Sequence, residues 1–161
     1  EWPIKNVMLH MIRKSPERGK KLCHDLFYER VYLSSRVEHF ILECDELFKP
    51  VGREIGNRFK NHFHQEFRLI VKYLQLKYPD KYISLHFDKL IPFLNHIEAR
   101  KIPERRDHED QLRCVKTIQT LALKSEMIKY KVEENGIPWN ELKNSLLLGG
   151  HIIETIGEKV A

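Results

Sequence analysis

The stretch HEDQLRCVKTIQTLALKSEMIKYKVEE, residues 108–134, decides the fold class. Its apolar residues recur at spacings of three and four, which is the period of an α-helix and not of a β-strand. They cover a wide arc of the helix surface: Leu112, Val115, Ile118, Leu121, Ala122, Ile128 and Val132. A helix with so broad an apolar face packs against neighbours on more than one side. The stretch therefore predicts the central helix of an all-α fold.

The same helical period extends over most of the chain. Apolar stripes of this kind cover residues 4–12, 22–31, 37–48, 55–74, 83–97 and 142–156. No window alternates apolar and polar residues as a half-buried strand would. The sequence therefore predicts an all-α protein of six to seven helices, arranged as a bundle or as a short stack of helix pairs.

Capping residues and prolines predict where the N-terminal helices begin and end. Ser35 and Glu38 have the spacing of a capping box, so a helix should begin there. The alternative is one unbroken helix over residues 16–48. Pro50 should end this helix, because the residue before a proline disfavours the helical conformation. Pro92 should kink or split a later helix, since it removes one backbone hydrogen bond.

Glycines mark the boundaries of the last predicted helix. Asn135 and Gly136 predict a helix end, after which a final helix should occupy about residues 139–161. Gly149 and Gly150 interrupt its pattern, and each costs about 1 kcal/mol relative to alanine inside a helix. Such a pair indicates either a break in the helix or the close approach of a neighbouring backbone.

Length and composition fit a single folded domain over residues 1–161. Hydrophobic residues make up 42% of the chain and charged residues 32%, a balance that is typical of globular and not of disordered proteins. The sequence starts at Glu1 and not at a methionine, so we expect one helical domain cut from a longer protein.

Cysteine usage and hydropathy predict an intracellular protein. Cys23, Cys44 and Cys114 are odd in number and far apart, which argues against a disulfide framework. No window approaches the roughly 18 apolar residues of a transmembrane helix, and no signal peptide is recognisable. We therefore expect a cytoplasmic or nuclear location and no membrane partner.

Two connectors carry the candidate binding residues. The net charge of the chain is +5. The basic residues gather in two short runs: Arg13, Lys14, Arg18, Lys20 and Lys21 in the first, and Arg100, Lys101, Arg105 and Arg106 in the second. If both runs lie at the same end of the bundle, they form one patch that could bind the phosphates of DNA or RNA, or an acidic partner. The alternative is that these charges only solvate the surface.

Two histidine–glutamate pairs suggest a metal-binding alternative. His39 and Glu43 lie one helical turn apart, and so do His62 and Glu66. Such pairs on facing helices can ligate a metal ion in a bundle core. The simpler interpretation is that they are surface pairs that stabilise their own helices. We assign no metal ligand and no cofactor.

The run His62–Glu66 resembles the second helix of hemerythrin-like di-iron proteins. That family carries two histidines four residues apart on the next helix. Here His86 is followed by Leu90, and His96 by Arg100. The resemblance is therefore limited to a few residues and assigns no family.

The sequence contains no recognisable catalytic arrangement. It has no GxSxG nucleophile motif and no glycine-rich phosphate loop. Cys23 and His24 are adjacent, and adjacent residues on a helix point about 100° apart, so they do not form a dyad. These observations favour a protein that acts by binding over an enzyme.

We therefore predict a helical protein–protein interaction domain: an adaptor, scaffold or dimerisation module of a larger intracellular protein. Its partner would be another protein or a second copy of itself, bound along an exposed groove or helix face. Nucleic-acid binding through the basic connectors is the first alternative. A metal-binding helical bundle is the second.

Overall fold

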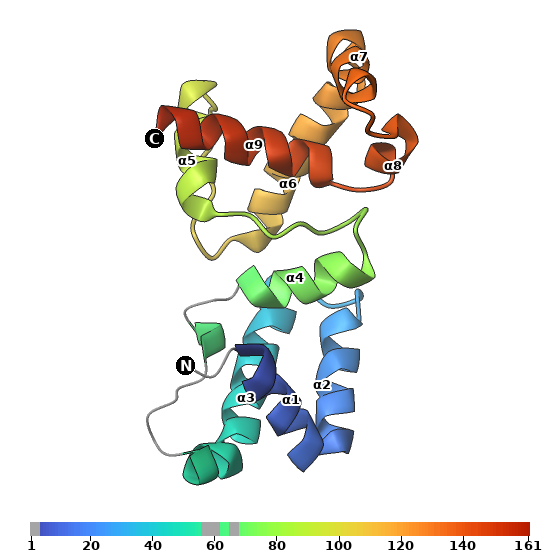
Figure 1. Cartoon of the computed structure of the whole chain (residues 1–161). Coiled ribbons are helices and arrows are strands. Elements are labelled where there is room, and N and C mark those ends of the chain that lie inside the picture. The colour runs from blue at the N-terminus through green and yellow to red at the C-terminus, as the bar shows by residue number, and fades with distance from the viewer. Residues whose placement is uncertain (1–3, 56–61, 65–67) are drawn as a thin grey trace. The chain divides into compact units, whose positions relative to one another are not determined.

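The structure is a computed structural model that describes residues 4–55, 62–64 and 68–161 (Figure 1). These residues form helices and connecting turns with no β-strand among them, which confirms the predicted all-α class. None of the described helices is long and apolar enough to cross a membrane. Contacts within the chain divide it into two compact units, Glu1–Ile70 and Val71–Ala161. One domain over the whole chain stays a prediction.

The first unit is built on three α-helices that pack against one another. Its described elements are α1 (Ile4–Lys14), α2 (Pro16–Phe27), α3 (Leu33–Ile55) and the 3-10 turn η1 (His62–His64). Almost fully buried side chains from all three helices form its core: Met11, Leu22, Leu26, Phe40, Leu47 and Val51. The Phe40 ring meets the Phe63 ring edge to face, with 5.3 Å between the centroids, so η1 packs onto this core.

The link between α2 and α3 differs from both predicted arrangements. α2 ends at Phe27 and α3 begins at Leu33, two residues before the predicted capping residue Ser35. The cause is a tertiary hydrogen bond, in which the buried guanidinium of Arg36 donates to the carbonyl of Leu26 across 2.7 Å. This contact satisfies a carbonyl at the end of α2 and fixes the first turn of α3. A local sequence pattern does not report such a contact.

Two prolines lie inside helices. α3 continues through Pro50, and α5 (Phe87–His96) continues through Pro92. An interior proline costs a helix about 3 kcal/mol. Next to Pro50, the Leu47 and Val51 side chains are almost fully buried, and burying each contributes about 1.5–3 kcal/mol. The predicted helix end at Pro50 is therefore wrong, and α5 is not split at Pro92.

The long helix predicted over residues 55–74 takes a different course where the structure describes it. Residue 55 is the last residue of α3, and the next described residues form the 3-10 turn η1. A regular helix resumes with α4 (Arg68–Lys77). The boundary between the two units falls within α4, after Ile70. The rest of the prediction lies outside the described residues.

In the second unit, α9 packs against both α5 and α6 (Figure 1). The elements after α5 are α6 (His108–Leu123), α7 (Glu126–Glu134), α8 (Trp139–Lys143) and α9 (Leu147–Val160). Almost fully buried side chains of α5, α6 and α9 form the core: Leu90, Phe93, Leu94, Val115 and Ile153. The broad apolar face of α6 is thus shared between the core and its other neighbours.

The segment 108–134 forms two helices and not one. The break falls at Lys124 and Ser125, where the Ser125 hydroxyl caps α7 by accepting the N–H of Ile128 across 3.3 Å. The last predicted helix is likewise divided into α8 and α9 by residues 144–146. The described residues therefore form nine α-helices, which is more than the six or seven predicted.

A buried amide holds α8 and α9 onto α6. The side chain of Gln119 donates to the carbonyl of Leu142 across 2.9 Å, and its oxygen accepts the N–H of Gly149 across 2.6 Å. Both backbone groups lie at the ends of helices, where an intrahelical partner is missing. One side chain thus satisfies two backbone groups at the break between α8 and α9.

The glycines of α9 allow close approach and do not break the helix. A Cβ on Gly149 would lie 2.9 Å from the carbonyl oxygen of Val115, and a Cβ on Gly157 would lie 2.0 Å from that of Lys89. Of the two explanations for the predicted glycine pair, a break in the helix is wrong, and close approach of a neighbouring backbone holds for Gly149, whereas Gly150 lies against the side chain of Ile83. These residues have a packing role.

Candidate functional site

The nine predicted basic residues belong to two different units. The run between Arg13 and Lys21 lies at the end of α1 and in α2. The run between Arg100 and Arg106 lies in the connector from α5 to α6. A joint patch formed by both runs stays a prediction, and each run is considered within its own unit.

Two cations of the first run are held by acidic residues of the same unit. The Arg18 guanidinium donates to the Glu43 carboxylate across 3.1 Å, and the Lys21 ammonium donates to Asp25 across 2.6 Å. The hydrogen bond between Lys21 and Asp25 raises the pKa of the ammonium and lowers that of the carboxyl. The other three basic side chains of the run are exposed: Arg13, Lys14 and Lys20. At least two of the five cations of this run are therefore engaged with carboxylates of their own unit.

The connector from α5 to α6 is fixed at both ends. At the end of α5, Glu98 adopts a φ of 51°, and the N–H of Ala99 donates to the carbonyl of Leu94 across 2.9 Å. Such a closing turn favours glycine, because a side chain costs about 1–2 kcal/mol in this left-handed conformation. At the other end, the Gln111 amide donates to two carbonyls of the connector, each 2.9 Å away.

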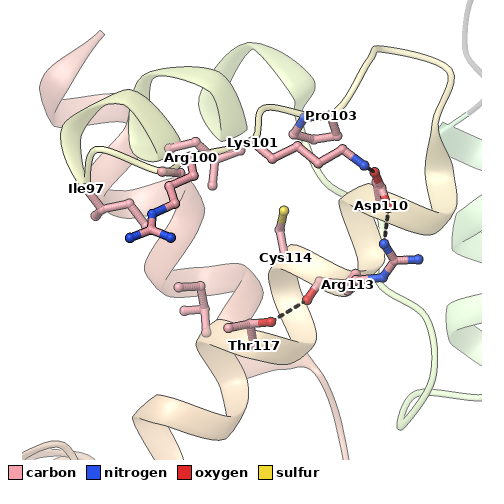
Figure 2. Close-up of a pocket in the computed structure, with 11 residues that line it drawn as sticks. Ile97, Arg100, Lys101, Pro103, Asp110, Arg113, Cys114 and Thr117 are labelled. Carbon is pink, nitrogen blue, oxygen red and sulfur yellow. Dashed lines mark hydrogen bonds and ion pairs between the residues drawn. The ribbon is translucent and has the colours of Figure 1, made fainter.

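An open pocket is lined by this connector, the end of α5 and the adjoining turns of α6 (Figure 2). The cavity has a volume of about 260 Å³. Its lining is mostly apolar, with charged side chains among it: Leu94, Ile97, Ala99, Arg100, Lys101, Pro103, Asp110, Arg113, Cys114, Thr117 and Ile118. All of these residues belong to the second unit, so the pocket is complete within that unit.

One carboxylate joins two of the cations at this pocket. Asp110 forms an ion pair with Lys101 and a second one with Arg113, the latter across 2.5 Å. The Asp110 side chain is 11% exposed, whereas those of Lys101 and Arg113 are 75% and 72% exposed. The hydrogen bond between Lys101 and Asp110 lowers the pKa of the carboxyl and raises that of the ammonium. An ionised carboxylate therefore lies beneath two cations that reach into solvent.

The three arginines of the connector differ in their contacts. Arg105 donates to Asp88 across 2.6 Å and lies over the Phe87 ring, 4.9 Å from its centroid. Arg100 lines the pocket and forms no ion pair with a residue that the structure describes. Arg106 is exposed and does not line the pocket. Of the four cations predicted here, the pocket brings together Arg100 and Lys101.

The sulfur of Cys114 points into the pocket (Figure 2). Burial raises the pKa of its thiol, as it does for Cys23, and burial raises the pKa of Cys44 to about 12. The thiolate, and not the thiol, is the nucleophile and the metal ligand. All three cysteines are free, and at neutral pH they are protonated. Cys114 therefore contributes shape and apolar surface to the pocket.

The predicted histidine–glutamate pairs do not form a metal site where the structure describes them. The Nε2 atom of His39 lies 3.5 Å from Asp25, whereas Glu43 pairs with an arginine of α2. The other pair, His62 and Glu66, extends outside the described residues. Within the described part of the chain, no group of three or more His, Cys, Asp or Glu side chains could hold a metal ion.

Sequence reasoning identifies two of the pocket residues as binding candidates and misses the cavity. Leu94, Ile97 and Ile118 all have the spacing of core residues, and Leu94 is indeed buried. Ile97, however, is 45% exposed at the edge of the pocket. The sequence signal that could have indicated the site is the apolar stripe with Leu94 and Ile97, which continues to the start of the charged connector with Arg100 and Lys101.

The pocket offers a ligand three properties: a hollow of defined size, an apolar floor and positive charge at its edge. These properties support binding, and the protonated thiol adds no nucleophile to them. No protein-family model, curated protein or solved structure matches the chain.

Proposed function

We propose that this chain is a helical protein-interaction domain, and that its partner binds at the pocket formed by α5, α6 and their connector. The observation that carries the proposal is the pocket itself, an open cavity of about 260 Å³ with a mostly apolar lining and a charged edge. Accessible apolar surface with a polar rim is typical of interaction sites. The residues that dominate protein interfaces fill such pockets and are surrounded by contacts that exclude water.

The volume of the pocket, about 260 Å³, is sufficient for one large side chain of a protein partner and lies close to the lower end of the range of about 300–1,000 Å³ for small-molecule pockets. A single leucine, phenylalanine or tryptophan side chain is small enough to enter. The partner would therefore insert one large apolar residue as an anchor.

Two exposed isoleucines lie in or next to the lining of the pocket in the sequence, and the first of them, Ile97, adds apolar surface to the pocket itself. Ile97 lines the pocket and is 45% exposed, and Ile102, between two lining residues of the connector, is 43% exposed. Each Å² of apolar surface that a partner covers contributes about 25 cal/mol. The anchor residue and its neighbours would therefore gain hydrophobic stabilisation from the same small area.

The charges of the connectors support a protein partner more than a nucleic acid. Four of the nine predicted cations pair with carboxylates of their own unit: Arg18, Lys21, Lys101 and Arg105. This pairing reduces the positive charge that a phosphate backbone would meet. Single-stranded nucleic acid also stacks its bases on aromatic side chains, and the lining of the pocket contains none.

The test fills the pocket and measures whether peptide binding is lost. Peptides are selected from a random display library against the whole chain, and their affinities are measured by fluorescence anisotropy. Cys114→Phe places a ring where the sulfur points into the cavity. Thr120→Phe is the matched control, because Thr120 is an exposed residue of α6 outside the lining. We expect Cys114→Phe to weaken binding at least about tenfold, or 1.4 kcal/mol, and Thr120→Phe to leave it unchanged.

A second filling variant guards against a loss of folding. Thr117→Trp introduces its ring at an exposed residue of the lining, so it perturbs the core less than Cys114→Phe. Circular dichroism shows whether each variant remains helical. If the selected peptides bind the wild-type chain and both folded variants equally, the pocket is not the binding site and the proposal is wrong.

A further inference from the structure

We infer that the partner segment is acidic: beside the apolar residue that enters the pocket, it carries a glutamate or aspartate that binds at the Arg100 side of the mouth. The inference rests on the proposed function and names the partner of the same site. What supports it is the charge around the pocket, and not its volume.

The mouth of the pocket carries more positive than negative charge. Three cations belong to its lining, Arg100, Lys101 and Arg113, and one carboxylate, Asp110. That carboxylate is shared, because it pairs with both Lys101 and Arg113. The lining residues therefore carry a net charge of +2, and Asp107 also attracts Lys101, so Arg100 is the lining cation that no acid in the described part of the chain engages in this way. A partner segment with negative charge complements this edge, whereas a basic segment is repelled by it.

The arrangement of the charges shows where the acidic group would bind. Arg100 forms no ion pair with a residue that the structure describes, although it lies at the same mouth as the Asp110 cluster. Figure 2 shows the Arg100 guanidinium on the Ile97 side of the pocket, away from the ion pairs of Asp110. A guanidinium binds a carboxylate through two parallel N–H donors. Arg100 is therefore the contact that a partner carboxylate would complete.

Because the lining of the pocket is mostly apolar, the ligand should carry an apolar side chain as well as an acidic group, as a peptide can. A free phosphate or a nucleic-acid backbone would meet the cations but leave the apolar lining exposed to water. A purely apolar segment would fill the cavity but leave the excess positive charge unmatched. A segment in which a leucine, phenylalanine or tryptophan adjoins an acidic residue satisfies both features of the site. This combination is the one that a helix-in-groove partner presents along one face.

The experiment uses defined peptides, so that charge and anchor are varied separately. The probes are short acetylated peptides with a central leucine, phenylalanine or tryptophan, flanked on both sides by glutamate, glutamine or lysine. They are titrated into the whole chain by anisotropy at low and at physiological salt. The variants are Arg100→Glu and, as a matched control, Arg106→Glu, which makes the same charge change in the same connector outside the lining.

The inference predicts an ordered set of affinities. An exposed ion pair strengthens binding by up to about fivefold, so the glutamate peptide should bind the wild-type chain roughly fivefold more tightly than the glutamine peptide. The lysine peptide should bind most weakly, and added salt should reduce these differences. Arg100→Glu leaves two positive and two negative charges in the lining, so it should abolish the preference for the glutamate peptide over the lysine peptide. Arg106→Glu should keep the wild-type order.

The outcomes separate this inference from the proposed function. If the three charge forms bind the wild-type chain equally and Cys114→Phe still abolishes binding, the pocket is the site but the partner is not acidic. If Arg106→Glu changes the order as much as Arg100→Glu does, long-range charge and not the pocket contact accounts for the preference. If no designed peptide binds in any charge form, the inference is overturned, whereas the proposed function stands or falls with the library-selected peptides and the two filling variants.

Discussion

Gly157 gives the sharpest test of the packing of α9, because the obstacle beside it is backbone. A Cβ there would lie 2.0 Å from the carbonyl oxygen of Lys89, whereas an ordinary contact is 3.4–4 Å. α9 and α5 would therefore have to separate by more than an ångström. Overpacking costs about 1–3 kcal/mol, and alanine returns about 1 kcal/mol of helix propensity. Since a backbone carbonyl cannot rotate away, the overpacking cost should lie at the upper end of its range, about 3 kcal/mol, so that Gly157→Ala lowers the free energy of unfolding by a net amount of about 2 kcal/mol.

Gly150 provides the matched control within the same helix. A Cβ there would lie 2.3 Å from the Cδ1 atom of Ile83, which is the end of a flexible side chain. We therefore expect Gly150→Ala to cost less than Gly157→Ala. Urea and thermal unfolding followed by circular dichroism measure both variants, and for a chain of 161 residues about 2 kcal/mol corresponds to a fall of roughly 4–8 °C in Tm. Equal costs, or a more stable Gly157→Ala, would refute the packing argument.

Three further predictions concern charge, pH and a buried amide. We expect no tight binding of short DNA or RNA at physiological salt; micromolar binding that Arg105→Glu with Arg106→Glu weakens would instead establish nucleic acid as the partner. Burial lowers the pKa of His108 below its unfolded value of about 6.5, so the unfolded chain binds more protons between the two values. The free energy of unfolding should therefore fall as the pH drops below 6.5, and urea titrations should show a smaller fall for His108→Gln but not for the exposed control His96→Gln. Gln119→Leu should cost about 2–4 kcal/mol in the same urea assay, because it leaves two backbone groups of the α8–α9 junction without partners; an unchanged midpoint would contradict this.

The helical class of the chain can be predicted from periodicity, but several helix boundaries cannot. The break at Ser125 coincides with a local N-cap, in which the Ser125 hydroxyl accepts the N–H of Ile128. Serine is a preferred N-cap residue, so a sequence rule can recognise this helix start. The start of α3 at Leu33 depends on Arg36, which reaches back to the preceding helix. Pro50 is tolerated because of the side chains that are buried next to it. In the last two cases tertiary contacts outweigh local preference, and a single sequence does not reveal them.

The candidate site could be predicted only in part for a similar reason. Charge runs are visible in a sequence, so Arg100 and Lys101 are selected as candidates, and the structure places both in the lining of the pocket. Whether a cation forms an ion pair depends on the acidic residues that the fold places next to it, such as Asp88 beside Arg105. A cavity leaves even less trace, because Ile118 has the same spacing whether it faces the core or the pocket. Both the ion-pair partners of the cations and the cavity itself are set by contacts between residues in the folded chain, which the sequence alone does not reveal.

The pocket also has a consequence for how the chain reaches its folded state. All of its lining residues lie between residues 94 and 118. The helices α5 and α6, however, make few direct contacts with each other, and both pack mainly against α9. The pocket therefore takes its final shape only when α9 has docked against both of them, although α9 contributes none of its lining residues. Because a ligand that binds only the folded state stabilises it, a partner bound in the pocket would also stabilise the docked position of α9.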